Sequence, residues 1–293
     1  GQVTYGQLAD QVRRFAGSLK ALGLKREERV LLLMQDSSDW VVAFLGSLYA
    51  GVVPVAVNTL LTAEDYAYML ANSRAQAALV SGALLPTLQT ALGQAKNEVQ
   101  HVVVSRPTEP LPASLHDMAA LVAQGQAGVP ASTLADEPAF WLYSSGSTGK
   151  PKGTVHTQGN LYWTAELYGK PVLGLRENDT VFSAAKLFFA YGLGNGMTFP
   201  MSVGATAVLM AERPTPAPAG GSSSCADIAA VSSSTSNCVC SRRLMFSCTR
   251  ADRRSMAALP PTNVLTAWPI LISCSCPRKA LNYPDAPAQS IRE

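Results

Sequence analysis

Apolar residues recur along the first part of the chain at spacings that predict alternating helices and strands. The first apolar set shares one helical face: Leu8, Val12, Phe15, Ala16, Leu19 and Leu22. Gly23 follows this set and predicts the end of the helix. Residues 30–34 then form a short apolar run of the kind that becomes a buried parallel strand.

The alternation continues further along the chain. The pattern predicts a helix over 40–50 that ends at Gly51, a strand over 52–57, and a helix with Thr62 as its N-cap. Residues 77–80 and 102–104 predict further strands. Residues 106–136, rich in Pro, Ala and Gly, predict a surface connection with a short helix near 115–122. Helices that alternate with strands indicate an α/β fold with doubly wound, mainly parallel sheets.

One uncharged stretch, residues 187–211, is long enough to span a bilayer. It also carries glycines and Pro200, which would interrupt a membrane helix. We therefore expect a buried helix–turn–strand here and no membrane span.

Composition divides the chain at residue 216. All six cysteines lie after residue 217, whereas all three histidines lie before it. The tail carries a net charge of +4 and the preceding part a net charge of −1, and the tail has no sustained hydrophobic period. We expect a partial, truncated N-terminal domain over 1–216 and an irregular or disordered tail over 217–293.

Three interpretations of the tail compete. Cys238, Cys240, Cys274 and Cys276 suggest metal ligands, but their spacing is tighter than in structural zinc sites and no histidine is near. Six cysteines would suit a secreted disulfide framework, but the preceding part is typical of a cytoplasmic protein. We favour a segment not selected to fold, such as an out-of-frame or misjoined one, and we predict no metal site.

A glycine- and hydroxyl-rich loop follows a predicted strand over 139–143. The loop residues with candidate roles in binding phosphate are Ser144, Ser145, Gly146, Ser147, Thr148, Gly149, Lys150, Lys152 and Gly153. Glycines let the backbone turn sharply and aim N–H groups at phosphate oxygens, while hydroxyls and lysines add donors and positive charge. The pattern therefore predicts an anion-binding loop.

Other phosphate-loop classes match less well. A Walker-type loop needs Ser or Thr after the Gly-Lys pair, and here Pro151 follows Lys150. A dinucleotide fingerprint needs a Gly-x-Gly-x-x-Gly that opens a helix, and Gly146 has no such partners.

The loop closely resembles the phosphate loop of the adenylate-forming, or AMP-binding, superfamily, and residues 51–55 and 58–62 are also similar to it. Within that superfamily, residues 163–169 and 184–195 are very similar to benzoate–CoA ligases. The resemblance covers about residues 1–216. It implies a cytoplasmic acid–thiol ligase that uses ATP, Mg²⁺ and coenzyme A to activate an aryl carboxylate.

The resemblance also implies roles for individual residues. Thr148 and Lys152 would be catalytic and hold the β- and γ-phosphates, and Ala190, Tyr191 and Gly192 would line the aryl-acid pocket. We expect Phe188 and Phe189 to pack in the core. The net charge of +3 gives no indication of a nucleic-acid or membrane partner.

The superfamily's adenine, ribose and adenylation-lysine segments have no counterpart after Pro216, where Lys279 is the one lysine and its setting does not match. We therefore expect this chain to lack ligase activity. Two alternatives stay open: an adenylating enzyme for another acid, such as a fatty or amino acid, and a non-catalytic nucleotide-binding fragment. An amino-acid substrate is disfavoured because residues 180–210 contain no Asp or Glu to pair with its amino group.

Overall fold

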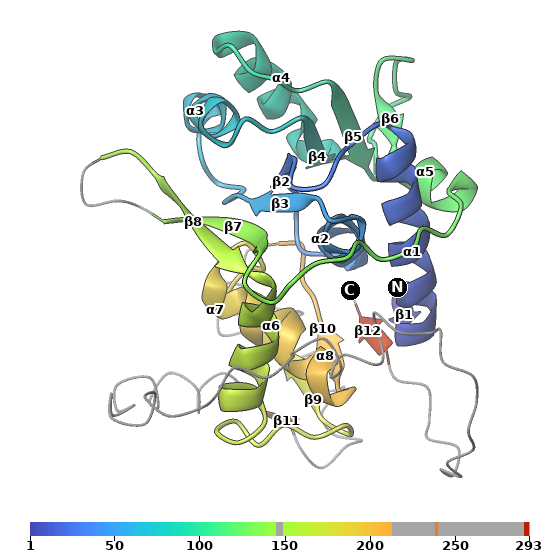
Figure 1. Ribbon diagram of the computed structural model, residues 1–293, viewed down its shortest axis with the longest axis vertical. Helices are drawn as coiled ribbons and strands as arrows, with labels where there is room; N and C mark the ends of the chain where they lie inside the picture. The colour runs from blue at the N-terminus through green and yellow to red at the C-terminus, as the bar shows by residue number, and fades with distance from the viewer. Residues whose placement is uncertain (145–148, 213–237, 240–289, 293) are drawn as a thin grey trace, which may run out of the picture.

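The computed structural model describes residues 1–144, 149–212, 238–239 and 290–292, and its larger sheet has seven strands (Figure 1). The strand order is β6-β5-β4-β2-β3-β7-β8. The strands are β2 (Arg29–Leu33), β3 (Val53–Ala56), β4 (Ala77–Ser81), β5 (His101–Ser105), β6 (His116–Asp117), β7 (Pro138–Ser144) and β8 (Lys152–Thr157). Every neighbouring pair is parallel except β7 and β8, which form an antiparallel hairpin at one edge.

Helices cover both faces of this sheet, as the sequence predicted. One face packs against α1 (Tyr5–Ala21), α2 (Ser38–Ala50) and α5 (Met118–Gln124). The other packs against α3 (Ala63–Ser73) and α4 (Leu85–Gln94), with the 3₁₀ turn η1 (Gly82–Leu84) before α4. Alternate residues of β2 enter the two cores, since Val30 and Leu32 face the α1–α2 side and Leu31 and Leu33 face the α3–α4 side. The doubly wound α/β fold is confirmed.

The helix ends follow the sequence signals. Thr62 caps α3 in a capping box with Asp65. Gly51 ends α2 in the left-handed conformation, with φ of 79°, and Gly23, with φ of 89°, lies just beyond α1. The short helix predicted near 115–122 forms as α5, a few residues later than expected.

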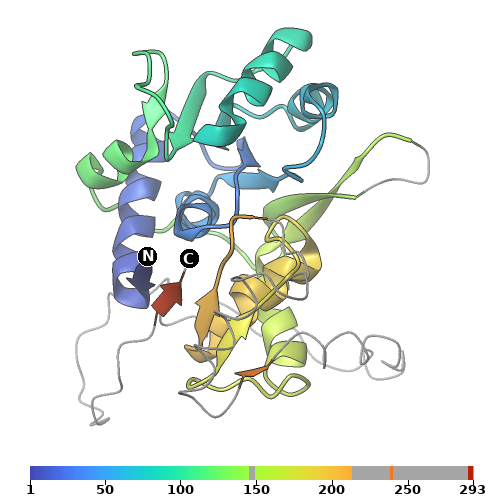
Figure 2. The ribbon, with the colours of Figure 1, turned by 180° about the vertical axis from the view of Figure 1, so that it is seen from behind.

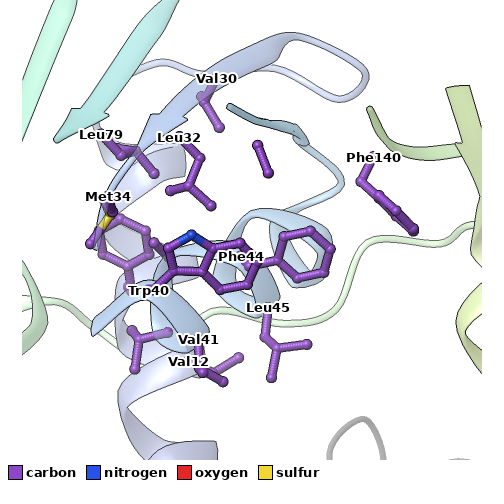
Figure 3. Close-up of a cluster of buried hydrophobic side chains, with 14 of the residues drawn as sticks. Val12, Val30, Leu32, Met34, Trp40, Val41, Phe44, Leu45, Leu79 and Phe140 are labelled. Carbon is purple, nitrogen blue, oxygen red and sulfur yellow. The ribbon is translucent and has the colours of Figure 1, made fainter. Parts of the chain in front are cut away.

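An aromatic group in the α1–α2 core anchors strand β7 (Figure 3). The Trp40 and Phe44 rings of α2 stack with centroids 5.1 Å apart, and Phe44 meets the edge of Phe140 on β7 at 5.3 Å. Such pairs contribute about 1 kcal/mol each beyond the apolar area they bury. Strand β7, which leads into the predicted anion loop, is thereby fixed to the core.

After the β7–β8 hairpin, the chain forms a second group of short helices and most of a smaller sheet. The helices are α6 (Gln158–Thr164), α7 (Ala190–Leu193) and α8 (Phe199–Val203), with the π-helical turns η2 (Ala165–Gly169) and η3 (Gly194–Thr198). The smaller sheet has the order β1-β12-β10-β9-β11. Its strands are β1 (Gln2–Thr4), β9 (Thr180–Phe182), β10 (Thr206–Val208), β11 (Cys238–Val239) and β12 (Ser290–Arg292). The sequence reading did not predict this sheet.

Residues 187–211 form the expected buried helix–turn–strand, from α7 through η3 and α8 to β10. Within the ranges given above, no helix has the length and apolar character needed to cross a bilayer. Phe188 is buried as predicted, but the prediction for Phe189 is wrong because 46% of its surface is exposed. The exposed Phe189 ring packs against the buried Phe188 ring, with their centroids 4.6 Å apart.

The structure describes two parts of the tail, both short strands of the smaller sheet, β11 and β12. The remainder of the predicted irregular tail and the side chains of its cysteine pairs lie outside the described residues. The boundary at residue 216 stays a prediction.

Candidate functional site

The predicted anion loop lies at the carboxyl edge of the larger sheet. Strand β7 runs parallel to β3, with Val55 beside Trp141 and Ala56 beside Leu142. Strand β8 returns antiparallel and pairs Lys152 with Ser144. Ligands of open α/β sheets bind outside the carboxyl ends of the strands, and the hairpin projects beyond that edge (Figure 1).

Five of the nine predicted loop residues are described: Ser144, Gly149, Lys150, Lys152 and Gly153. Gly149 has a φ of 94°, which L-residues rarely adopt. The side chains of Ser144, Lys150 and Lys152 are exposed, so a hydroxyl and two ammonium groups are accessible at the mouth of the hairpin. Ser145, Gly146, Ser147 and Thr148 lie outside the described residues, and their predicted roles stay predictions.

Helix α3 supports the hairpin next to its loop, which sequence reasoning did not foresee. The Tyr143 hydroxyl donates to Asn72 Oδ1 at 2.7 Å, and burial raises the pKa of Tyr143, so this donor keeps its proton. Lys150 Nζ lies 5.2 Å from the centre of the Tyr68 ring. An exposed cation–π contact contributes about 0.5–1 kcal/mol, which a phosphate group could readily outcompete.

Glycine is also required on the returning strand. A Cβ on Gly153 would lie 3.0 Å from the indole ring of Trp141 and 3.5 Å from Tyr143. The backbone of β8 therefore lies close against these aromatic rings at the residue that follows Lys152.

The predicted acid-pocket residues lie together on the four-residue helix α7. Ala190 and Tyr191 are exposed, with 44% of the Tyr191 surface accessible, and Gly192 is buried. A Cβ on Gly192 would lie 2.6 Å from the Ala185 carbonyl oxygen and closer still to that of Lys186. The buried Asn195 donates from Nδ2 to the Tyr191 carbonyl at 2.9 Å, which fixes the turn that presents the Tyr191 ring.

The acid-pocket segment, residues 185–193, shares one hydrophobic core with strand β7, which leads into the loop. Phe140 and Leu142 of β7 belong to the same buried cluster as Leu187, Phe188 and Leu193. Both views show α7 beside the base of the β7–β8 hairpin (Figures 1 and 2). The two parts predicted from separate motifs therefore lie at one edge of the molecule.

A buried ion pair lies behind the acid-pocket segment. Asp36 follows β2 and is 5% exposed, and its Oδ2 lies 3.9 Å from Lys186 Nζ. Desolvation raises the pKa of Asp36 to about 6, against the opposing effects of the Lys186 charge and the Leu187 N–H. Burial lowers the pKa of Lys186, while Asp36 and Glu212 act in the opposite direction. Sequence analysis missed this pair because its members are 150 positions apart in the chain.

Asp36 should make stability fall as pH rises. Its folded pKa of about 6 exceeds the ordinary value of 3.8, so its contribution is complete below pH 4 and is lost as pH rises through 6. The shift corresponds to about 3 kcal/mol. The free energy of unfolding of the wild type should therefore fall relative to that of Asp36→Asn as pH rises from 4 to 7. Urea unfolding at several pH values measures both. Asp10→Asn, which alters an exposed carboxylate, is the control. A wild-type–Asp36→Asn difference that is constant with pH would contradict the assignment.

Among the described residues, no three or more His, Cys, Asp or Glu side chains gather in a way that could hold a metal ion. The exposed side-chain donors in the described part of the site are the ammonium groups of Lys150 and Lys152 and the hydroxyl of Ser144, a set that matches anionic oxygens.

A strand leading into a glycine-rich hairpin with exposed lysines, on a doubly wound sheet, is what the adenylate-forming resemblance implied. The family model "AMP-binding enzyme" matches residues 1–241, and the chain belongs to this family. The match extends past the composition change at residue 216.

Particular relatives of the chain act on aryl acids by name. The chain is 53% identical over 219 residues to the benzoate–CoA ligase of Thauera aromatica, and the match covers 74% of this chain and 40% of that protein. It is 44% identical over 214 residues to a 4-hydroxybenzoate–CoA/benzoate–CoA ligase of Rhodopseudomonas palustris, covering 73% and 39%. A benzoate CoA ligase structure from Burkholderia xenovorans matches with a TM-score of 0.66 at 56% identity, covering 73% and 41%. The chain thus spans about 40% of the length of these relatives.

Proposed function

We propose that residues 1–216 supply the ATP-phosphate loop and the acid pocket of an ATP-dependent aryl-acid–CoA ligase of the benzoate type. In the first step a carboxylate oxygen attacks the α-phosphorus of ATP, the bond to the β-phosphate breaks, and an acyl adenylate and pyrophosphate form. In the second step the coenzyme A thiolate attacks the acyl carbon, and AMP leaves with the electrons of the broken carbon–oxygen bond. The observation that carries the proposal is the accessible Lys150 and Lys152 at the mouth of the β7–β8 hairpin, together with helix α7, which carries the exposed Tyr191 and lies beside the base of the same hairpin.

Within this proposal the loop binds the pyrophosphate end of ATP. Lys152 and Thr148 contact the β- and γ-phosphates as catalytic residues. Lys150, the loop hydroxyls and the backbone N–H groups around Gly146 and Gly149 complete the contacts. Charge on the departing pyrophosphate grows as its bond breaks, so preorganised cations there stabilise the transition state more than the ground state.

Mg²⁺ would enter with the nucleotide. This ion keeps several waters and binds mainly through substrate phosphates, so a dedicated protein cage is not expected. Ammonium and hydroxyl donors suit the phosphate oxygens of a metal–nucleotide complex. The lysines and the ion would share in neutralising those oxygens.

The acid would lie against α7. Ala190 is small and exposed beside Tyr191, whereas Gly192 is buried against the Ala185 and Lys186 carbonyl groups. A flat slot beside the Tyr191 ring, on its Ala190 side, would suit an aryl carboxylate. The names of the relatives support this substrate class, because those quoted above act on benzoate or hydroxybenzoate.

We also propose that the 293-residue chain by itself forms no acyl-CoA, because residues 217–293 contain no match to the adenine, ribose and adenylation-lysine motifs. Phosphate contacts alone leave the carboxylate and the α-phosphate poorly aligned, and alignment can be worth several orders of magnitude in rate. Such a chain would bind nucleotide without turnover.

Two proteins test these proposals side by side. The first is the chain itself, and the second is a chimera in which residues 1–216 precede the downstream part of the Thauera aromatica ligase that this chain does not match. Each is incubated with ATP, Mg²⁺, coenzyme A and either benzoate or a fatty acid, and acyl-CoA is measured by chromatography. We expect benzoyl-CoA from the chimera and none from the chain. Benzoyl-CoA from the chain would refute the second proposal, and a chimera that prefers fatty acids would refute the first.

Filling the acid slot should separate acid use from ATP use. Ala190 is exposed at the start of α7, so Ala190→Phe places a ring in the slot without disturbing the core. In the chimera we expect kcat/KM for benzoate to fall about tenfold or more, because overpacking a site costs about 1–3 kcal/mol. The KM for ATP should change little.

The control for this change is Ala119→Phe, an exposed position on α5, which packs beside β5 and β6 at the opposite edge of the larger sheet from the hairpin. Steady-state kinetics at saturating ATP and at saturating benzoate give both constants. Equal losses for ATP and benzoate would argue against a pocket beside α7.

A further inference from the structure

We infer that Asp36 is a positioning residue for the acid pocket, acting through Lys186 and Leu187 on the α7 turn. The inference rests on the proposed function and assigns a role to a buried carboxylate of the first βα unit. Asp36 lies just after β2, between the larger sheet and the acid-pocket segment.

The first link is direct contact between Asp36 and the acid-pocket segment. The Leu187 backbone N–H donates to the Asp36 carboxylate, at 3.2 Å from Oδ1 and 3.4 Å from Oδ2. Lys186 Nζ lies 3.9 Å from Oδ2. The buried Asp36 carboxylate thus binds two consecutive residues, Leu187 through its backbone N–H and Lys186 through its side-chain charge. A buried carboxylate with these partners is costly to leave unpaired, which makes the contact geometrically specific.

The second link ties the same lysine to the smaller sheet. Lys186 Nζ donates to the carbonyl oxygens of Met210, Ala211 and Glu212, which follow strand β10. The ammonium group therefore joins the end of β10 to the end of β2. Residues 186–187 are held between the two sheets.

The third link runs from Lys186 to the acid-pocket residues. The Lys186 carbonyl accepts a hydrogen bond from Phe189 N at 3.0 Å, which closes the turn before α7. The backbone of Gly192 lies against the carbonyl groups of Ala185 and Lys186, with no room for a side chain between them. A shift of Lys186 would therefore move Gly192, and with it Tyr191.

This chain of contacts has a specific consequence. Losing the Asp36 carboxylate should loosen residues 185–193 and disturb acid binding. The phosphate loop has supports that Asp36 does not touch, namely the contact of Phe140 with Phe44 and the hydrogen bond from Tyr143 of β7 to Asn72 of α3, so phosphate binding should persist. A side chain that merely stabilised the fold would weaken both.

The test uses the 293-residue chain and three variants. Asp36→Leu removes both the charge and the acceptor for Leu187 N–H, and Asp36→Asn keeps an acceptor oxygen. Asp39→Asn is the control, because Asp39 bonds Ser105 and Arg106 instead. The measurements are hydrogen exchange by mass spectrometry, and calorimetric titrations with benzoate and with pyrophosphate.

In Asp36→Leu we expect exchange over 185–193 to accelerate at least tenfold while β4 and α3 keep their protection. Benzoate affinity should fall at least tenfold, with pyrophosphate affinity within twofold of the wild type. Asp36→Asn should show smaller effects in the same direction, and it decides the matter if the leucine variant does not fold. Unchanged exchange over 185–193, or equal losses for benzoate and pyrophosphate, would overturn the inference. Absence of benzoate binding by the wild type would count against the proposed acid pocket, and the exchange data would still decide the role of Asp36.

Discussion

Replacing Lys152 with alanine should lower benzoate-dependent ATP–pyrophosphate exchange by the chimera about 100-fold or more. Lys152 is exposed at the mouth of the hairpin and pairs with Ser144 across the strand ends, so its ammonium group can reach a bound pyrophosphate. Removing one preorganised group that stabilises developing charge typically costs two to three orders of magnitude in rate. Isotope exchange between labelled pyrophosphate and ATP measures the effect without the thiol step.

The control is Lys25→Ala, which removes an exposed lysine from the connection between α1 and β2. Lys150→Ala should have a smaller effect than Lys152→Ala, because part of the contact it loses is with the Tyr68 ring. Unchanged exchange kinetics in Lys152→Ala would remove the loop from the active site.

Adding a single methyl group at Gly192 should be almost as damaging. The Cβ of Gly192→Ala would collide with the Ala185 and Lys186 carbonyls, and these are main-chain atoms that cannot rotate away. We expect about 3 kcal/mol of destabilisation from overpacking. Because the α7 turn must shift, kcat/KM for benzoate in the chimera should fall by about 100-fold, since misplacing a bound substrate by about 1 Å can slow a reaction that much.

Gly93→Ala is the matched control, since a Cβ there in helix α4 meets nothing within 4 Å. That variant should be as stable as the wild type, or more so, because alanine favours a helix. Denaturant unfolding and steady-state kinetics measure both effects. A Gly192→Ala enzyme with normal benzoate kinetics would mean that the turn does not form the pocket.

Much of the larger sheet could be predicted from periodicity alone. Its central strands are continuous apolar runs such as residues 30–34, and its helices carry strong end signals such as Thr62 and Gly51. These signals are local, and each agrees with the packing that results.

The smaller sheet escaped prediction for a physical reason. Strands β9 and β10 are three residues each, too short to show a period, and they pair across 26 positions of chain. The exposure of Phe189 was missed similarly, because the run Leu187-Phe188-Phe189 shows no alternation that would separate buried from exposed rings.

The candidate site was also predictable only where its residues form local motifs. The hairpin and α7 carry compact motifs, so their residues could be named in advance. Their supports could not be named, because Tyr68, Asn72 and Asp36 reach the site only through folding. Contacts between distant segments leave no spacing pattern in a single sequence.

The most direct test of the central claim is acid-dependent ATP–pyrophosphate exchange by the chimera, with benzoate and decanoate compared at equal concentration. This measurement isolates adenylation, the step for which residues 1–216 would supply both the phosphate loop and the acid pocket. We predict exchange that depends on benzoate and is weak with decanoate. Exchange that depends on decanoate and not on benzoate, or no exchange from a folded chimera, would contradict this claim.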